Sequence, residues 1–348
     1  MILRRESVRC SRRGSHSMRV VAACSASLFL VSTIAWGAPE WGAMPQIESA
    51  ARQAVMPVRR LDDERWEKVQ GCARTIAAGA VNQVLVTGCG GQYAHDTIYE
   101  WKSGGESGEF VAEPPGSVML AFRQAGMSVE ETKRQPAQAS WLAIDAVAGK
   151  VYGIGPDSTL YSRPVASPYP HHQWTQFVGA QVYMQPMQVT AVAAGDGHGR
   201  GDLWAISAQP GGAGGNRIYA SETCPAKDRV VSGRCWRPVD GAAQKVALGN
   251  ETWVVSSDGG IFRRNGNGWQ RVEGCARDVA ANGGHVYVVG CDSATGGGGR
   301  IFRRVGDSWR DTHQTGKTLA VDVAGNLWVV KAGGEIWRRK AIRPDPVR

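Results

Sequence analysis

The feature that most constrains this chain is an isoleucine or leucine followed by an aromatic residue, a pair that recurs along the sequence. Each pair follows an apolar run such as "TWVVS" (252–256) or "VYVVG" (286–290). Each of those runs follows another that is rich in small residues, such as "KVALG" (245–249). A repeated pattern of this length indicates a supersecondary unit that stacks on copies of itself. The six pairs are Ile98-Tyr99, Leu160-Tyr161, Ile218-Tyr219, Ile261-Phe262, Ile301-Phe302 and Ile336-Trp337.

Each repeat is long enough for four short strands. The most compact one, from Trp236 to Trp269, takes 33 residues, which suits four strands of about five or six residues. We expect an aromatic-led first strand, a second strand of small residues, a third that carries an aromatic residue, and a fourth that holds the Ile-aromatic pair. Glycine, asparagine and aspartate separate the runs because they tolerate positive φ. The residues that open the units are Trp66, Trp174, Trp236, Trp269, Trp309 and, as the degenerate sixth, Phe110.

Six units of four antiparallel strands predict an all-β fold, a six-bladed β-propeller with four-stranded antiparallel blades. The composition agrees, since 45 glycines, 13 tryptophans and only 20% charged residues suit a protein of strands and tight turns. We expect inserted loops in blades 2 and 3, at 117–138 and 208–235, and a short helix at 44–55. The predicted parts are a signal peptide (1–37), an N-terminal segment (38–65), the propeller (66–340) and a C-terminal tail (341–348).

The N-terminal residues have the layout of an export signal. Arg19 precedes an apolar run (20–36), and Ala35 and Gly37 are small residues at the −3 and −1 positions of a cleavage site. Met18 is an alternative start, and export by the general or the twin-arginine route stays open. Cys24 matches a lipoprotein box locally, but the apolar run follows it instead of preceding it. We therefore expect a secreted or periplasmic protein.

Charge and hydropathy exclude two classes of partner. Residues 1–37 hold six arginines and one glutamate, so they supply most of the net charge of +9. The remaining 34 basic and 30 acidic residues do not give the clustered basic face that nucleic-acid binding requires. Outside the signal, no apolar stretch reaches the roughly 18 residues that span a bilayer. The sequence therefore predicts no nucleic-acid partner and no membrane span.

Cysteine positions within the repeat predict the disulfides. Six cysteines follow the signal, and 15 pairings are open in principle. Two units place one cysteine before the second strand and another after the third, where an antiparallel hairpin brings the two within bonding distance; the other units have neither. Zinc would need four convergent ligands, and no such set is present, so we predict no metal and no cofactor. The predicted disulfides are Cys72–Cys89 and Cys275–Cys291, and the remaining pair, Cys224–Cys235, is left to close its own loop.

The repeat resembles a known family. The segments "WQRVEGCARDVAANGGHVYVVG" (269–290) and "GRIFRRVGDSW" (299–309) follow the tectonin pattern, in which W-x-x-V-x-G precedes a V-A run, a V-W-x-V run and I-Y/F-R-R. The resemblance covers about residues 66–340 and is clearest in units one and four to six. It implies a six-bladed propeller lectin that binds a glycan or glycoconjugate, such as a surface lipopolysaccharide.

A sugar site needs an aromatic face and a few polar groups. The aromatic platforms are expected on the third strand and the polar partners among the arginines of the Arg-Arg pairs at 263–264, 303–304 and 338–339, which could also hold a carboxylate or phosphate. The alternative is that the aromatics pack between blades and that one arginine of each pair packs while the other is solvated. The candidate ligand-binding residues are Trp204, Trp253, Tyr287, Trp328, Arg263, Arg303 and Arg338.

Catalytic motifs are not recognisable. The histidines occupy unrelated places in the units, and none belongs to a metal motif or a nucleophile elbow. "DGHGRGD" (196–202) has His198 and Arg200 where a calcium loop would need oxygen ligands. We therefore expect no catalytic residues and no enzyme. The alternative to glycan binding is a protein-interaction scaffold that uses the insertions at 117–138 and 208–235.

Overall fold

The structure is a computed structural model, and its described elements are all β-strands. None of the described residues forms a helix long and apolar enough to cross a membrane. The expected signal peptide, the helix at 44–55, the insertion at 117–138 and the C-terminal tail lie outside the described residues. The described ranges are 66–94, 97–104, 107–112, 143–147, 149–165, 174–177, 187–195, 202–224, 234–293 and 298–340.

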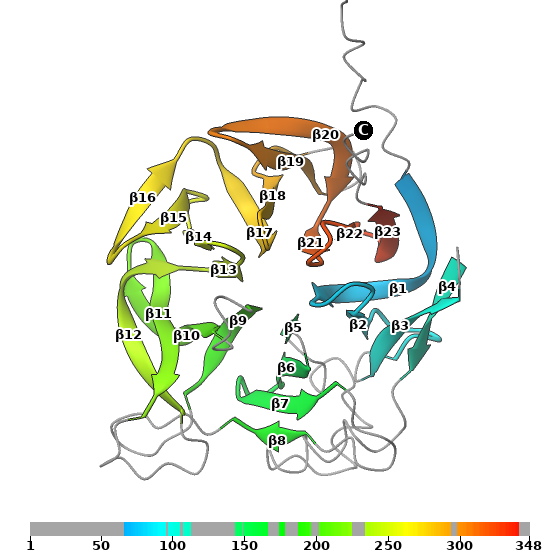
Figure 1. The fold of residues 1–348 in the computed structure, drawn as a ribbon, viewed down its shortest axis with the longest axis horizontal. Helices are drawn as coiled ribbons and strands as arrows, with labels where there is room; N and C mark the ends of the chain where they lie inside the picture. Colours follow the sequence, from blue (N-terminus) through cyan, green and yellow to red (C-terminus); the bar gives the residue numbers. More distant parts are fainter. Residues whose placement is uncertain are drawn as a thin grey trace, which may run out of the picture. The chain divides into compact units, whose positions relative to one another are not determined.

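The described strands form a β-propeller with four-stranded antiparallel blades (Figure 1). Four separate sheets of these strands are such blades. In chain order, the first of these four comprises β5 (Ala143–Val147), β6 (Lys150–Ile154), β7 (Leu160–Pro164) and β8 (Thr175–Gln176). The next comprises β9 (Val189–Gly195), β10 (Asp202–Gly212), β11 (Gly215–Thr223) and β12 (Arg234–Ala243). Then come β13 (Lys245–Leu248), β14 (Thr252–Val255), β15 (Ile261–Asn265) and β16 (Gly268–Val272). The last comprises β17 (Ala276–Asn282), β18 (His285–Gly290), β19 (Gly299–Val305) and β20 (Ser308–Gly316).

A fifth sheet of seven described strands joins the two ends of the propeller. It contains β1 (Trp66–Ala78), β2 (Val84–Gly88), β3 (Ile98–Gly104), β4 (Ser107–Ala112), β21 (Thr318–Val321), β22 (Leu327–Val330) and β23 (Glu335–Arg339). The first part of β1 pairs with β23, and its second part pairs with β2. A strand from the start of the repeat region thus completes the sheet built by its last strands.

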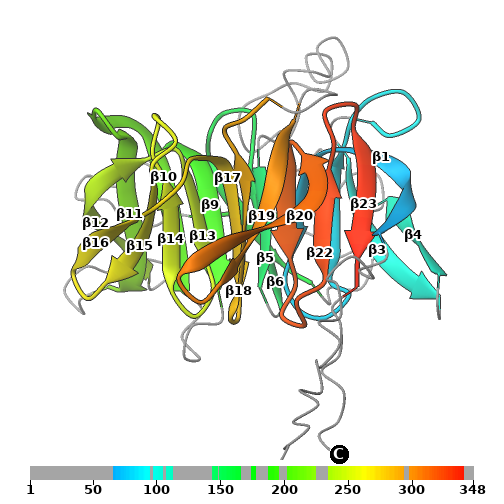
Figure 2. The same ribbon diagram turned by 90° about the horizontal axis from the view of Figure 1, so that it is seen from above.

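The innermost strands surround the ring axis. They contact one another in the closed cycle β1, β5, β9, β13, β17, β21 and back to β1. In the turned view inner strands such as β13, β14 and β22 run along this axis (Figure 2). Hydrophobic clusters fill the spaces between neighbouring sheets, as where Trp253 and Val255 pack with Val279 and Val288. The core is therefore shared between blades.

The tryptophan strand closes a blade and does not open one. Gly266 has φ +55°, and it forms with Asn267 a two-residue turn that pairs Asn265 with Gly268. Trp269 therefore lies in the strand next to the Ile-aromatic strand of its own blade, and Trp309 is placed in the same way beside β19. The expected strand order is thus wrong by one strand. Trp66 also lies beside an Ile-aromatic strand, but its strand β1 comes before that strand, β23, in the chain and not after it.

The three predicted disulfides are confirmed. Each joins neighbouring antiparallel strands or their immediate ends, and each has Cα atoms within the range that a disulfide spans. The Cα–Cα distances are 5.5 Å for Cys72–Cys89, 5.4 Å for Cys275–Cys291 and 4.9 Å for Cys224–Cys235.

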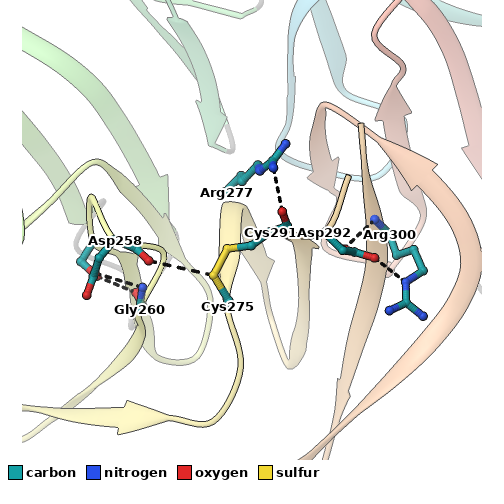
Figure 3. The surroundings of a disulfide bond; sticks show 8 residues. Asp258, Gly260, Cys275, Arg277, Cys291, Asp292 and Arg300 are labelled. Carbon is teal, nitrogen blue, oxygen red and sulfur yellow. Dashed lines mark hydrogen bonds and ion pairs between the residues drawn. A yellow bond between two sulfur atoms is a disulfide. The ribbon is translucent and has the colours of Figure 1, made fainter. Parts of the chain in front are cut away.

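Two of the disulfides also lie against a turn between two other strands. Cys275–Cys291 lies against the β14–β15 turn, and Cys72–Cys89 lies against the β22–β23 turn. Gly259 has φ +84°, and a Cβ atom there would lie 2.5 Å from Sγ of Cys275. Its carbonyl accepts a hydrogen bond from the N–H of Ala276 at 2.9 Å. Gly334 repeats this arrangement, because its φ is also +84° and a Cβ atom there would lie 2.4 Å from Sγ of Cys72. Figure 3 shows the Cys275–Cys291 disulfide beside the turn that precedes β15.

Candidate functional site

The predicted aromatic platforms lie at the junctions between neighbouring sheets. Trp253 is 2% exposed, Tyr287 and Trp328 are each 1% exposed, and Trp204 is half-buried. The ring of Trp204 lies 6.1 Å from that of Trp269, and the ring of Trp253 lies 6.2 Å from that of Trp309, in edge-to-face geometry. These contacts support the packing alternative. Ligand binding by the four aromatic residues stays a prediction.

The second arginine of each pair packs against aromatic rings. Arg264 lies 5.9 Å from the ring of Trp204 and 5.1 Å from that of Trp269, so it connects two blades. Arg339 lies over Tyr287 and Trp66 in the same way, at 5.2 and 5.7 Å, and donates a hydrogen bond to the Tyr287 hydroxyl. Cation–π contacts of this kind stabilise by about 0.5–2 kcal/mol. The second arginines therefore have a structural role.

The first arginine has an internal partner in two of the three pairs. Arg263 stands opposite Gln270, and its Nε donates to Oε1 of Gln270 at 3.0 Å. Its guanidinium also lies 3.8 Å from the carboxylate of Glu251. Arg338 is buried and forms an ion pair with Glu67 at 2.7 Å. It also lies over Trp328, so it is not the solvated member of its pair.

Arg303 differs from both. It stands directly opposite Arg310 on the neighbouring strand, and its other cross-strand neighbour is Tyr287. Within the described part of the chain, neither arginine side chain forms a hydrogen bond or an ion pair, although Arg310 is exposed and Arg303 is half-buried. His285 lies nearby, and burial first and the positive charge of Arg303 second hold its pKa below the ordinary value.

Three tryptophans at equivalent positions of the outer strands are half-buried. They are Trp66, Trp269 and Trp309. Trp269 donates from Nε1 to the carbonyl of Asp240 at 2.6 Å, and Trp309 donates to the carbonyl of Glu273 at 2.8 Å. Each ring also has an arginine over it. The rim of the propeller therefore repeats one combination of a partly exposed indole and a guanidinium.

Sequence reasoning missed the residues that stand opposite the first arginines. These are Gln270, Arg310 and Glu67. Each directly follows a rim tryptophan, which was assigned to the start of the next unit. For Gln270 and Arg310 the signal is the glycine-bearing turn between the Arg-Arg pair and the tryptophan, because a two-residue turn fixes the register of the hairpin. Glu67 has no such signal, because its strand comes from the other end of the repeat region.

The innermost strands line a narrow axial cavity of about 140 Å³. Alanines stand opposite the aromatic position in the inner strands, except that β5 has Asp145 opposite Tyr152. Burial raises the pKa of Asp145 to about 7, although its carboxylate accepts hydrogen bonds from the N–H groups of Ala194 and Ala146.

A second carboxylate of this cavity also bridges two blades. Asp278 accepts hydrogen bonds from the hydroxyl of Thr318 at 2.6 Å and from the N–H of Leu319 at 3.3 Å, and Lys245 lies 3.9 Å away. Asp278 and Asp145 thus each satisfy a backbone donor at the inner edge of the next sheet. The described residues hold no group of three or more histidine, cysteine, aspartate or glutamate side chains that could bind a metal.

No protein-family model and no curated protein matches this chain. Solved structures do resemble it. A gluconolactonase of Xanthomonas campestris is 12% identical with a TM-score of 0.51, and the match covers 81% of this chain and 91% of that one. The WD40 β-propeller domain of Doa1 is 11% identical, with 80% and 97% covered and a TM-score of 0.46. A streptogramin B lyase is 12% identical, with 79% and 96% covered and a TM-score of 0.45. The likeness to the gluconolactonase shows the β-propeller fold alone.

Proposed function

We propose that this protein is an exported, six-bladed, tectonin-like propeller that binds a glycan without catalysis. The count of six treats the seven-stranded sheet as two blades that share β1, and the cycle of innermost strands supports this count. Export to the periplasm or the cell exterior is supported by the three disulfides, which persist in oxidising compartments.

The observation that carries the proposal is the repeated rim combination of a half-buried tryptophan with an arginine. Trp269, Trp309 and Trp66 occupy the same position in successive units, and each has a guanidinium over its ring. An indole offers a flat apolar face to the C–H surface of a sugar, and the N–H groups of the half-buried Arg264 and Arg304 can donate to its oxygen atoms. Equivalent sites on several blades suit a polymeric ligand, because linked weak sites give high avidity.

The second candidate is a protein-interaction scaffold, and a different surface favours it. Val81 and Val323 are 54% and 49% exposed. They lie on adjacent turns, since the N–H of Val323 donates to the carbonyl of Gly79 at 3.1 Å. A pair of exposed valines on adjacent turns would suit an apolar side chain of a partner protein.

A glycan array separates the two candidates. The protein, a rim variant (Trp269→Ala with Trp309→Ala) and a turn variant (Val81→Asp with Val323→Asp) are compared, with circular dichroism as the test of folding. We expect the rim variant to lose array binding by at least about tenfold, which is about 1.4 kcal/mol. The turn variant should bind like the unmodified protein. Absence of binding to any glycan by the folded protein would contradict the proposal.

A further inference from the structure

We propose that Arg303 and Arg310, on the outer strands β19 and β20, form a binding site for the acidic group of a saccharide, a carboxylate or a phosphate. The acidic-group part stands on the geometry of this blade, whereas the saccharide part rests on the proposed function. The site lies where the β17–β20 blade faces β23 and the first part of β1.

The first argument is the juxtaposition of two like charges. Directly opposed residues of an antiparallel pair have Cβ atoms about 4.5–5.5 Å apart, and like charges placed there destabilise the sheet. Arg303 and Arg310 are such a pair. A guanidinium presents five N–H donors in a planar fork that matches a carboxylate or a phosphate. Two adjacent forks without a side-chain partner in the described residues therefore make a ready receptor for one anion.

The second argument is a comparison with the same positions elsewhere in the repeat. The residue opposite the first arginine is Gln270 in the β13–β16 blade and Glu67 in the seven-stranded sheet. The residue two positions before the blade's aromatic residue is Glu251 in the former blade and His285 in the β17–β20 blade. The two partners of Arg263, Gln270 and Glu251, are thus replaced in the β17–β20 blade by Arg310 and His285. The architecture does not require this, because the neighbouring blade forms with neutralised partners.

The third argument is that nearby carboxylates are already engaged. Asp311, next to Arg310 in sequence, forms an ion pair with Arg300 at 3.2 Å. Asp307 forms one with Arg304 at 2.9 Å. Asp322, which acts on His285, is buried and accepts hydrogen bonds from the N–H groups of its own turn. None of these three carboxylates, which lie in the described part of the chain, forms an ion pair with Arg303 or Arg310.

Aromatic rings from this blade and from the facing sheet lie beside the two arginines. Tyr287 stands across from Arg303, and Arg339 lies over the rings of both Tyr287 and Trp66. The half-buried Trp66 is therefore at the same blade junction as the arginine pair. A sugar acid could place its charged group on the arginines and its apolar face toward the indole. This combination favours a saccharide over a free anion.

The test uses oligogalacturonate as the acidic probe, neutral oligogalactose as its matched control, and inorganic phosphate as the free anion. Arg310→Gln copies the β13–β16 blade, and Arg310→Glu copies the seven-stranded sheet. Arg217→Gln is the control, since Arg217 is an exposed arginine of β11, in another blade, and its Nε donates to the carbonyl of Pro210. Isothermal titration at low and moderate salt measures each affinity. We expect Arg310→Glu to weaken oligogalacturonate binding at least about tenfold. Arg310→Gln should weaken it less, and Arg217→Gln should leave it unchanged.

A second readout is the titration of His285 by NMR. An anion on Arg303 offsets the positive charge that holds the His285 pKa down, so bound oligogalacturonate should raise this pKa. Equal binding of oligogalacturonate by the unmodified protein and Arg310→Glu would overturn the site. Binding of oligogalactose with no preference for the acid would also overturn it, while leaving glycan binding intact. Phosphate binding as strong as that of oligogalacturonate would keep the anion site and overturn its saccharide part.

Discussion

The β13–β16 and β17–β20 blades have nearly the same outer hairpin and use it differently. Both contain Ile-Phe-Arg-Arg, a two-residue turn and a tryptophan, and in both the second arginine lies over that tryptophan. The first arginine is neutralised by Gln270 and Glu251 in one blade and faces Arg310 and His285 in the other. The comparison teaches that the Ile-Phe pair and the turn of this motif are architectural. What varies, and what function can use, is the partner of its first arginine.

The largest effect is expected where the two blades agree. Trp253→Ala should lower the free energy of unfolding by about 3–5 kcal/mol, as for other buried aromatic residues truncated to alanine. The reason is that the ring of Trp253 is buried and packs on Trp309 of the next blade. Denaturant unfolding measures the loss. A stable Trp253→Ala variant that had lost glycan binding would instead assign this residue to a ligand site.

The next effect tests a feature that only one of the two blades has. The Cys275–Cys291 disulfide, with a sequence separation of 16, should contribute about 3 kcal/mol. Replacing both cysteines with serine should remove that contribution, as measured by unfolding under non-reducing conditions. The equivalent residues of the β13–β16 blade are Ala242 and Ser257, so Ser257→Ala serves as the control and should change stability little.

Gly259 sharpens this second prediction. Gly259→Ala should destabilise the intact protein because φ is +84° and the new Cβ atom would meet the disulfide sulfurs. In the variant without Cys275 and Cys291, only the cost of the backbone conformation should remain. If Gly259→Ala lowers the free energy of unfolding equally with and without the two cysteines, then the close approach to the sulfur atoms does not contribute to the destabilisation.

The sequence repeat predicted the strand content, the propeller fold and the disulfides Cys72–Cys89 and Cys275–Cys291, because each depends on which residues recur in each unit. Cys224–Cys235 was the pair that remained. The repeat did not show where a blade begins. A repeated pattern gives the length of a unit but not the strand at which the unit starts. The strand of Trp269 could therefore belong to the unit before or after it. The error hid Gln270 and Arg310 as the cross-strand partners of Arg263 and Arg303, since a partner across a hairpin can be found only from the register. Burial of Trp253 and Trp328 was expected only as an alternative, because sequence alone does not show which neighbouring sheet covers a face.

A smaller effect follows from the opposed arginines. Arg310→Glu should raise the free energy of unfolding by roughly 0.2–1 kcal/mol, because it replaces a like-charge pair by an opposite-charge pair. The converse change, Gln270→Arg, should lower stability by a similar amount in the β13–β16 blade. Thermal unfolding at low salt measures both. Screening by salt should shrink the two effects, and equal effects at high and low salt would contradict their electrostatic origin.

The smallest effect is a pH dependence that separates His285 from its counterpart Glu251. The pKa of His285 is held below its ordinary value in the folded protein, so the unfolded chain binds the proton more readily. Stability should therefore fall as the pH decreases through the ordinary histidine pKa of about 6.5, and stop falling below the folded pKa.

Asp145 contributes a slope of the opposite sign over part of the same range. Its pKa is raised to about 7 in the folded protein, so its contribution is present at low pH and is lost as the pH rises toward that value. The His285 effect must therefore be measured as a difference. The Asp145 contribution cancels in the difference between Arg303→Gln and the unmodified protein, so the variant should gain stability relative to the unmodified protein as the pH falls from about 7 to 5, because removal of the nearby cation lets the His285 pKa rise. Arg263→Gln, beside Glu251, should leave the pH profile unchanged, and a change of the same size in both variants would place the coupling elsewhere than at the arginine pair.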